Sequence, residues 1–367
     1  MENQVLDIDI ICLKFGLSGE LTGFRKYGNG NINGTFMLEF QENGQAQKYI
    51  LQKINTDVFK NPSQLMSNLV SVTKHIKNYY SANGIDPDRR TLEFLQCDNG
   101  EHFFIDENGH CWRIYKFIDD VHTCETIDNE RVFCEAGRAF GEFQNILGTF
   151  DVSTLYDTIP DFHNTAKRFE TFKQAVQEDR KNRLANVKNE VDFVLAREGD
   201  THVLTDLIRD GKLPLRVTHN DTKLNNILFD KNTNEGICVI DLDTVMTGLS
   251  LYDFGDSIRS GANKTAEDDP NTDNVGIDLG LYEAFVSGYL SSAKSLTDIE
   301  KQYLPFSAKL LTLECGMRFL TDYLNGDTYF RTDYPNHNLD RCRNQFKLVE
   351  DIENNMETMK KITEKYC

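Results

Sequence analysis

The sequence has 367 residues, of which 39% are hydrophobic and 27% are charged, and its formal net charge is −18. This length is too great for one simple hydrophobic core and predicts two lobes or domains, while the composition is typical of a soluble globular protein. The acidic excess argues against nucleic-acid binding, because that binding depends on cationic side chains that neutralise phosphates.

Membrane insertion and disulfide bonding are also disfavoured. No stretch approaches the roughly eighteen apolar residues of a spanning helix, and segment 1–17 lacks the basic start of a secretory signal. The nine cysteines are scattered, odd in number and without a C-x-x-C pair, which favours reduced thiols. We therefore expect a cytoplasmic monomer with neither a membrane nor a nucleic-acid partner.

The first third of the chain is predicted to be rich in β-structure. Its predicted elements are a helix at 1–18, β-structure at 21–55, a helix at 62–82 and strands at 91–118. A Gly-rich turn is expected at 27–34, and Pro62 suits the first position of a helix. Asn108-Gly109 is typical of a hairpin turn.

After Asp120 the pattern becomes mainly helical. Helices are predicted at 129–149, within 164–197 and over most of 276–365, with two short apolar runs at Ile227–Phe229 and Ile237–Leu242 between them. A β-rich start followed by helices predicts an α+β, protein-kinase-like fold. We expect a small N-lobe at 1–118 and a larger helical C-lobe at 119–367.

The segment from Val217 to Phe229 carries the pattern H-x-D-x-x-x-x-N, formed by His219, Asp221 and Asn226. Kinases use this loop for phosphoryl transfer, where a carboxylate orients the acceptor hydroxyl and takes its proton. Asp221 is therefore the candidate catalytic base. A polar hairpin with turn-forming Asn and Asp is the structural alternative.

The ATP phosphates need a metal, and Mg²⁺ prefers hard oxygen ligands. Asn226 offers an amide oxygen, and Asp241, at the end of the next apolar run, offers a carboxylate. Lys223 can neutralise charge on the transferred phosphoryl group, whereas His219 is expected to support the loop. Asp253-Phe254-Gly255 spells a kinase metal motif but lies too far along the chain, so Asp253 and the nearby Asp256 are expected to cap a helix or brace the loop.

The Gly-rich turn is the candidate phosphate loop, because glycines let the backbone approach phosphates closely. Gly28, Gly30 and Asn33 are its candidate nucleotide contacts, although a plain β-turn explains the segment equally well.

The following strand is expected to carry a further phosphate contact. Strand alternation puts Gln52 where kinases carry a lysine, and Lys53 could replace it only through a bulge. Segment 61–84 contains no Asp or Glu, so the usual acidic partner of that lysine is missing as well. Tyr115 and Phe117 are either hinge residues beside adenine or core residues.

The H-N-D loop followed by I-D-L-D resembles the aminoglycoside phosphotransferase/choline kinase-like superfamily and, within it, the N-acetylhexosamine 1-kinases. The resemblance extends over Y-G-x-G, Y-I-L-Q, W-R-I-Y-K-F-I, D-F-G-D-S-I-R and L-E-C-G-M-R-F-L-T-D-Y-L. It implies a five-stranded N-lobe and transfer of the ATP γ-phosphate, with Mg²⁺, to the anomeric hydroxyl of GlcNAc or GalNAc. It also implies Asp221 as base and Asn226 and Asp241 as metal ligands. Asn29 and Asn31 depart from the usual Asp and His, which leaves the contacts of the loop open.

Sugar recognition needs hydrogen-bonding groups that face the base. Thr244 comes shortly after the candidate metal ligand Asp241, and Tyr329 is a further candidate. Glu314, Arg318 and Asp322 are spaced to share one helix face, either as a surface salt-bridge ladder or as part of a substrate site. The resemblance favours substrate contact by Arg318.

Three other functions compete with a sugar 1-kinase. A choline or aminoglycoside kinase should show an acidic or aromatic cage for its cationic acceptor. A protein kinase should show the motif A-P-E, which this sequence lacks. A nucleotide-binding pseudokinase is supported only by Gln52. The sequence does not distinguish GlcNAc from GalNAc.

Overall fold

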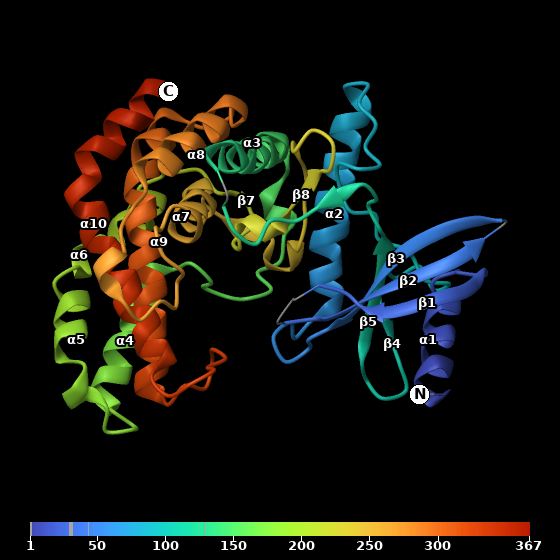
Figure 1. Ribbon diagram of the computed structural model, residues 1–367, viewed down its shortest axis with the longest axis horizontal. Helices are drawn as coiled ribbons and strands as arrows, with labels where there is room; N and C mark the ends of the chain where they lie inside the picture. Colours follow the sequence, from blue (N-terminus) through green and yellow to red (C-terminus); the bar gives the residue numbers. More distant parts are fainter. Residues whose placement is uncertain (1, 29–31, 43, 128) are drawn as a thin grey trace.

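The computed structural model describes residues 2–28, 32–42, 44–127 and 129–367. Gly30, together with Asn29 and Asn31 of the candidate phosphate loop, lies outside the described residues. Figure 1 shows a β-rich part formed by the start of the chain beside a larger, mostly helical part. The predicted α+β architecture is confirmed, whereas the division into lobes at 1–118 and 119–367 remains a proposal.

The β-rich part contains one antiparallel sheet of five strands in the order β1-β2-β3-β5-β4. The strands are β1 (Glu20–Lys26), β2 (Gly34–Glu42), β3 (Gln45–Ile54), β4 (Phe104–Ile105) and β5 (Cys111–Lys116). The expected hairpin turn joins β4 to β5, and Gly109 there has a φ of 80°, a conformation that glycine adopts without strain. The pairing of β3 with β5 aligns Gln52 with Arg113.

The two faces of this sheet pack against different elements. Helix α1 (Glu2–Lys14) covers one face, where Ile11 and Phe15 share a buried cluster with Leu51 and Ile114. Alternation along β3 and β5 therefore turns Gln52 and Arg113 toward the opposite face.

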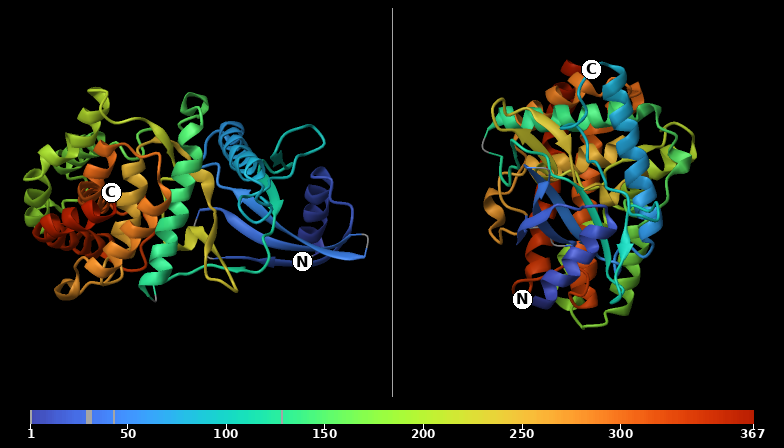
Figure 2. Two further views of the ribbon diagram at one scale, coloured as in Figure 1. Left: turned by 90° about the horizontal axis from the view of Figure 1, so that it is seen from above. Right: turned by 90° about the vertical axis from the view of Figure 1, so that its right-hand side faces the viewer.

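Helix α2 (Pro62–Ala82) begins with Pro62 in the first turn, as predicted, and lies between the sheet and the helical part (Figure 2). Its buried residues Leu65 and Val72 share one cluster with Ile54 of β3 and with Phe143 and Ile237 from the helical part. The core is thus continuous across the proposed lobe boundary.

The helical part surrounds two small sheets that present the motif residues. These contain β6 (Val121–His122), β8 (Ile227–Asp230) and β9 (Gly236–Val239) in one sheet, and β7 (Arg216–Thr218) and β10 (Met246–Gly248) in the other. The helices are α3 (Glu130–Ile146), α4 (Thr165–Glu178), α5 (Lys188–Leu195), α6 (Glu198–Arg209), α7 (Ser250–Gly261), α8 (Leu279–Ser292), α9 (Asp298–Asn325) and α10 (His337–Tyr366).

Close helix packing holds this part together. A Cβ atom at Gly288 of α8 would come within 1.9 Å of the Cys134 carbonyl oxygen on α3, and one at Gly255 of α7 would come within 2.5 Å of the Ser307 carbonyl oxygen on α9. These approaches hold α8 close against α3 and α7 close against α9. Within the described ranges no helix is long and apolar enough to cross a membrane. All nine cysteines lie in those ranges, and none forms a disulfide.

Candidate active site

The catalytic-loop backbone is held by a buried carboxylate on α7. Asp253 accepts hydrogen bonds from the backbone N–H of His219 at 2.9 Å and of Asn220 at 2.8 Å. The Nε2 of Gln144, on α3, donates to the same carboxylate at 2.8 Å. Asn220 can follow this path because it adopts a left-handed conformation with a φ of 66°. The D-F-G segment therefore braces the loop, as the sequence predicted.

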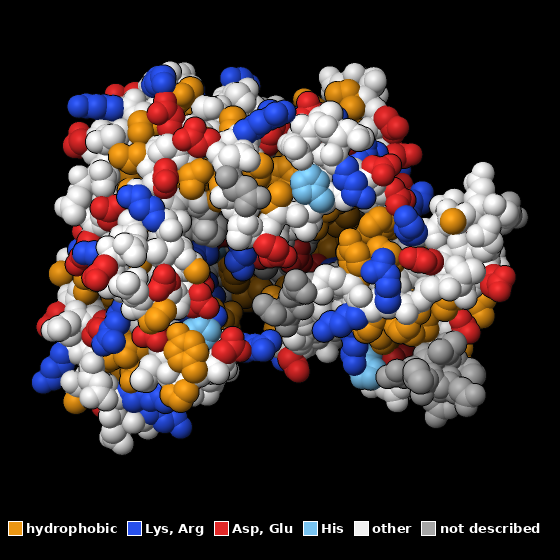
Figure 3. All heavy atoms as spheres, viewed as in Figure 1, with side chains coloured by type: hydrophobic (Ala, Val, Ile, Leu, Met, Phe, Trp, Pro, Cys, Tyr) orange, Lys and Arg blue, Asp and Glu red, His pale blue; other side chains and the backbone are white. Residues whose placement is uncertain are grey.

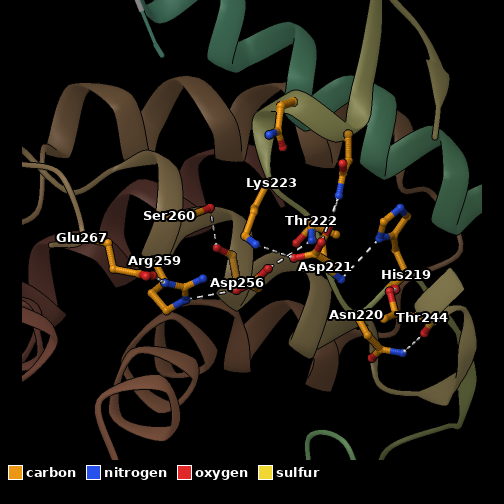
Figure 4. Close-up of polar contacts among 12 residues, drawn as sticks. His219, Asn220, Asp221, Thr222, Lys223, Thr244, Asp256, Arg259, Ser260 and Glu267 are labelled. Atoms are coloured by element: carbon orange, nitrogen blue, oxygen red, sulfur yellow. Dashed lines mark hydrogen bonds and ion pairs between the residues drawn. The ribbon is translucent and has the colours of Figure 1, made fainter. Parts of the chain in front are cut away.

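A second carboxylate of α7, Asp256, accepts from the backbone N–H of Thr222 at 3.0 Å (Figure 4). Arg259 donates to Asp256 through Nε at 3.0 Å and Nη2 at 2.8 Å, and it also pairs with Glu267. Burial would raise the pKa of Asp256, but the charges of Arg259 and Lys223 outweigh it and hold that pKa below its ordinary value. Asp256 is thus an anion that fixes the loop.

His219 supports the loop rather than facing the cleft. It is fully buried, its Nε2 lies 2.8 Å from the carbonyl oxygen of Ile240, and its Nδ1 accepts from the backbone N–H of Asp221 at 3.3 Å. These partners assign the neutral tautomer with the proton on Nε2. The rings of Phe140 and Phe143 flank the imidazole.

Asp221, Lys223 and Asn226 come together at the end of the loop. The Nζ of Lys223 lies 3.1 Å from Oδ1 of Asp221, and the Nδ2 of Asn226 lies 3.2 Å from its Oδ2. The Asp221 charge raises the pKa of Lys223 to about 12, so the ammonium persists at neutral pH. The Asp221 side chain is 31% exposed, which leaves room for an acceptor molecule.

Asn226 and Asp241 fit the donor set of a magnesium ion. The side-chain Nδ2 of Asn226 points toward Asp221, so the side-chain amide oxygen points away from Asp221. The backbone carbonyl oxygen of Asn226 accepts from the backbone N–H of Ile240 at 2.9 Å, which holds Asn226 beside Asp241. Burial, then the carboxylates of Asp243 and Asp221, raise the pKa of Asp241 to about 6. A carboxylate crowded by other anions is stabilised by a bound cation.

The described residues contain no cluster of three or more His, Cys, Asp and Glu suited to a metal. Mg²⁺ at phosphoryl-transfer sites commonly takes one or two carboxylates, with water and phosphate oxygens completing its octahedron. A pair of oxygen ligands therefore fits Mg²⁺ better than a transition metal.

On the sheet side of the site, Gln52 joins three neighbouring strands. Its Nε2 donates to Thr35 on β2 at 3.0 Å, and its Oε1 accepts from Nε and Nη2 of Arg113 on β5 at 2.9 and 2.6 Å. The pairing of β3 shows no register shift, so Lys53 stays on the α1 side of the sheet. No bulge delivers Lys53 in place of Gln52.

Asp243, two residues after Asp241, receives two donors from the β-rich part. Its Oδ1 accepts from Nη1 of Arg113 at 2.5 Å and its Oδ2 accepts from Nδ2 of Asn33 at 2.5 Å. The side chains of Arg113 and Asp243 are only 3% and 4% exposed. Sequence spacing gives no signal for either residue, because only the register of β3 with β5 puts Arg113 beside Gln52.

The remaining nucleotide candidates belong to the same five-stranded sheet, where Gly28 follows β1, Tyr115 lies on β5 and Phe117 follows β5. Phe117 contacts Tyr27, which precedes Gly28, edge to face at 5.7 Å between ring centroids. The Phe117 N–H already donates to the Lys48 carbonyl oxygen at 3.1 Å. Tyr115 packs edge-on against Phe94, and burial raises the pKa of its hydroxyl, so core packing is one of its roles. Gly28 has a φ of 71°, as a glycine turn allows.

Thr244 and Glu314 are committed to internal contacts. The Thr244 hydroxyl donates to the His219 carbonyl oxygen at 2.6 Å. Glu314 is buried and accepts from His163 Nδ1 at 2.7 Å and from Thr165 at 2.5 Å.

Asp322, also buried, accepts the backbone N–H groups of Tyr329 at 2.9 Å and of Phe330 at 3.0 Å. It therefore shapes the loop that carries Tyr329. Since Glu314 is buried as well, the surface salt-bridge ladder considered from the sequence is wrong.

Arg318 and Tyr329 meet beside an aromatic wall. Arg318 Nη2 lies 3.5 Å from the Tyr329 hydroxyl, and its guanidinium lies over the rings of Phe162, Tyr329 and Phe330. His163, which follows Phe162 in the sequence, places its Nε2 3.3 Å from the Asn220 carbonyl oxygen and so links this wall to the catalytic loop. Sequence spacing alone did not indicate Phe162 or His163. A hollow between the two parts of the molecule is visible in Figure 3.

Residues 105–284 match the model of the APH phosphotransferase enzyme family, and this range contains the whole catalytic loop. Among solved structures, a microcompartment-associated aminopropanol kinase is similar over 96% of this chain and 98% of its own, with a TM-score of 0.57 and 16% identity. An aminoglycoside phosphotransferase from Alicyclobacillus acidocaldarius subsp. acidocaldarius DSM 446 is similar over 97% and 96%, with a TM-score of 0.60 and 10% identity. An amicoumacin kinase in complex with AMP-PNP and Ca²⁺ is similar over 96% of each chain, with a TM-score of 0.59 and 13% identity. Identities this low establish a common fold.

Proposed function

We propose that this protein is an ATP- and Mg²⁺-dependent kinase of N-acetylhexosamines that forms the sugar 1-phosphate, and that it belongs to the APH phosphotransferase enzyme family, whose model residues 105–284 match. The observation that carries the proposal is the convergence of Asp221, Lys223 and Asn226 within hydrogen-bonding distance. These are a carboxylate base, a cation and an oxygen ligand, the three kinds of group that phosphoryl transfer requires.

In this proposal Asp221 orients the acceptor hydroxyl and takes its proton as the new P–O bond forms. Lys223, which stays charged at neutral pH, neutralises charge on the transferred phosphoryl group. Asn226 and Asp241 would hold Mg²⁺, which supplies further neutralisation of the phosphate oxygens. His219, Asp253 and Asp256 keep the loop rigid, so that the base does not reorganise during the reaction.

The charge of the acceptor side supports a sugar over an amine. Arg318 lies among aromatic rings, and burial together with the Arg318 charge lowers the pKa of the nearby Arg168. Two cations at an acceptor site disfavour choline or an aminoglycoside, whereas arginine and tyrosine donors beside rings suit a neutral sugar with an acetamido group. Arg318 and Tyr329 are the proposed residues for acceptor binding. Thr244 is proposed to join them only through its hydroxyl oxygen as a hydrogen-bond acceptor, because its hydroxyl hydrogen is donated to the His219 carbonyl oxygen.

The test is turnover of ATP with a panel of GlcNAc, GalNAc, galactose, choline and kanamycin, with products identified by phosphorus NMR. We expect N-acetylhexosamine 1-phosphates from the wild type. Asp221→Asn should lower kcat by about 10²–10⁴-fold. Asp206→Asn, which changes a partly exposed ion pair with Arg209 on α6, is the matched control and should keep full activity.

Phosphorylation of choline or kanamycin instead of a sugar would keep the catalytic assignment but contradict the acceptor. Absence of turnover with every acceptor, while ATP still binds, would contradict the kinase assignment and favour a nucleotide-binding protein without catalysis.

A further inference from the structure

The β-rich part carries an unusual cation. β3 has the neutral Gln52 where a lysine is expected. A positive charge is nevertheless present beside this position, because Arg113 on the neighbouring strand donates two hydrogen bonds to Gln52. Thr35, Gln52 and Arg113 are successive cross-strand neighbours on β2, β3 and β5. They form one polar row on the sheet face that is turned away from α1.

Arg113 ends this row in the region of the candidate metal site. Its Nη1 reaches Asp243, and the charges of Asp243 and Asp241 both raise the pKa of the guanidinium against the effect of burial. A buried guanidinium is costly without an anion, so some acceptor must face Nη1. Gln52 holds the Nε and Nη2 edge and thereby directs Nη1 toward Asp243, which lies in the turn after β9.

The carboxylate of Asp243 gathers donors in the manner of a phosphate group. Its two oxygens receive Arg113 from β5 and Asn33 from the candidate phosphate loop, both at 2.5 Å. Asn33 is itself oriented, because its Oδ1 accepts from the Asn55 N–H at 2.9 Å. Arg113 and Asn33 are thus two donors that are already oriented toward one anion, two residues after Asp241. Such a pair of donors suits a tetrahedral phosphate as well as a carboxylate.

We propose that Arg113, steered by Gln52, is the phosphate-binding cation for the nucleotide and that Asp243 occupies its Nη1 group until nucleotide phosphate replaces the carboxylate. This inference rests on the proposed use of ATP but not on the identity of the acceptor. No covalent step is involved. Arg113 exchanges one oxygen acceptor for another and keeps its two hydrogen bonds to Gln52.

The competing interpretation is a structural ion pair that only joins the sheet to the helical part. The two roles differ in what they do to ligands with and without phosphates. A phosphate-binding cation affects ADP and spares adenosine, whereas loss of a structural pair weakens both ligands together.

Calorimetric binding of ADP and of adenosine, without acceptor and with EDTA present, separates these roles. Arg113→Met should weaken ADP binding by about tenfold or more, while adenosine binding changes by less than about twofold. Arg113→Lys should recover part of the ADP affinity. Arg197→Met is the matched control, since Arg197, just before α6, makes a bidentate pair with Glu353 on α10, and the change should leave both ligands unaffected.

Asp243→Asn gives an independent test, which also decides the matter if Arg113→Met fails to fold. Removal of the competing charge should tighten ADP binding several-fold, whereas a purely structural pair predicts weaker binding. Equal losses for ADP and adenosine in Arg113→Met, unchanged ADP binding in that variant, or weaker ADP binding in Asp243→Asn would each overturn the inference. A wild-type protein that binds no ADP would overturn the proposed function as well.

Discussion

The candidate catalytic loop and the face of the sheet that is proposed to face the nucleotide are built in opposite ways. The loop is one short segment, 219–226, whose backbone is held by Asp253 and Asp256 from a helix only about thirty residues later. The nucleotide-facing side collects Asn33, Gln52 and Arg113 from three separate stretches and joins them to Asp243. A contiguous site keeps its geometry through local hydrogen bonds, whereas an assembled site depends on strand register and on the approach of distant parts.

Because of this difference, the two halves of the candidate site tolerate different changes. A residue of the catalytic loop keeps its position as long as α7 remains in place. A residue of the nucleotide-facing side can be exchanged for one on a neighbouring strand, since cross-strand partners reach the same space. Gln52 and Arg113 illustrate such an exchange. β3 has no lysine at position 52, but the side-chain amide of Gln52 holds the guanidinium of Arg113, which comes from β5.

The largest expected effect is on the bracing of the loop. Asp253→Ala removes the acceptor of two backbone N–H groups and of Gln144 and leaves them buried. At about 1–3 kcal/mol for each unsatisfied group, we expect a loss of about 3–5 kcal/mol in the free energy of unfolding and a fall of more than about 10²-fold in kcat. Denaturant unfolding and steady-state kinetics measure the two effects. The exposed Asp273→Ala is the control, and an active Asp253→Ala would show that the loop does not need this brace.

Removal of the cation beside the base should have the next largest effect. Lys223→Met should lower kcat by about 10²-fold, because an electrostatic contact to the transferred group is lost, while stability changes little at this exposed position. Lys223→Arg should retain part of the activity. Lys365→Met, at an exposed pair with Glu283 on α8, serves as the control. If Lys223→Met changed only the KM for ATP, the cation would act in binding and not in transfer.

The dependence on metal should vary with pH. Asp241 has its pKa raised to about 6, so below that pH Mg²⁺ must displace a proton from its ligand. The Mg²⁺ concentration for half-maximal activity should therefore rise by about tenfold between pH 7 and pH 5 and change little above pH 7. Circular dichroism at both values checks that the fold persists. An unchanged magnesium requirement would argue against Asp241 as a ligand.

The smallest effect is expected on the assembled side. Gln52→Ala frees Arg113 from two hydrogen bonds but leaves its charge and its contact with Asp243. We expect about threefold weaker ADP binding and a loss of about 1–2 kcal/mol in the free energy of unfolding. Gln47→Ala, at an exposed position of the same strand, is the control. A loss as large as that from removing Arg113 itself would make Gln52 the direct phosphate contact.

The sequence by itself determined the α+β architecture, the extent of α2, the β4–β5 hairpin and the grouping of Asp221, Lys223 and Asn226. Each depends on local signals, such as Pro62 at a helix start, Asn108-Gly109 at a turn, or residues a few positions apart in one loop. Local spacing fixes these features because few residues separate the interacting groups. The bracing role of Asp253 could be anticipated for the same reason.

Only the tertiary structure decided which cation faces Asp243 and what packs around Glu314 and Asp322. Arg113 lies 130 positions from Asp243 in the sequence, and His163 lies 151 positions from Glu314. Such pairs depend on strand register and helix packing, which periodicity does not specify. Glu314 and Asp322 seemed free to form a surface ladder because spacing shows which residues share a helix face, but not what packs against that face. Burial against α4 and the loop after α9 turned both into internal anchors.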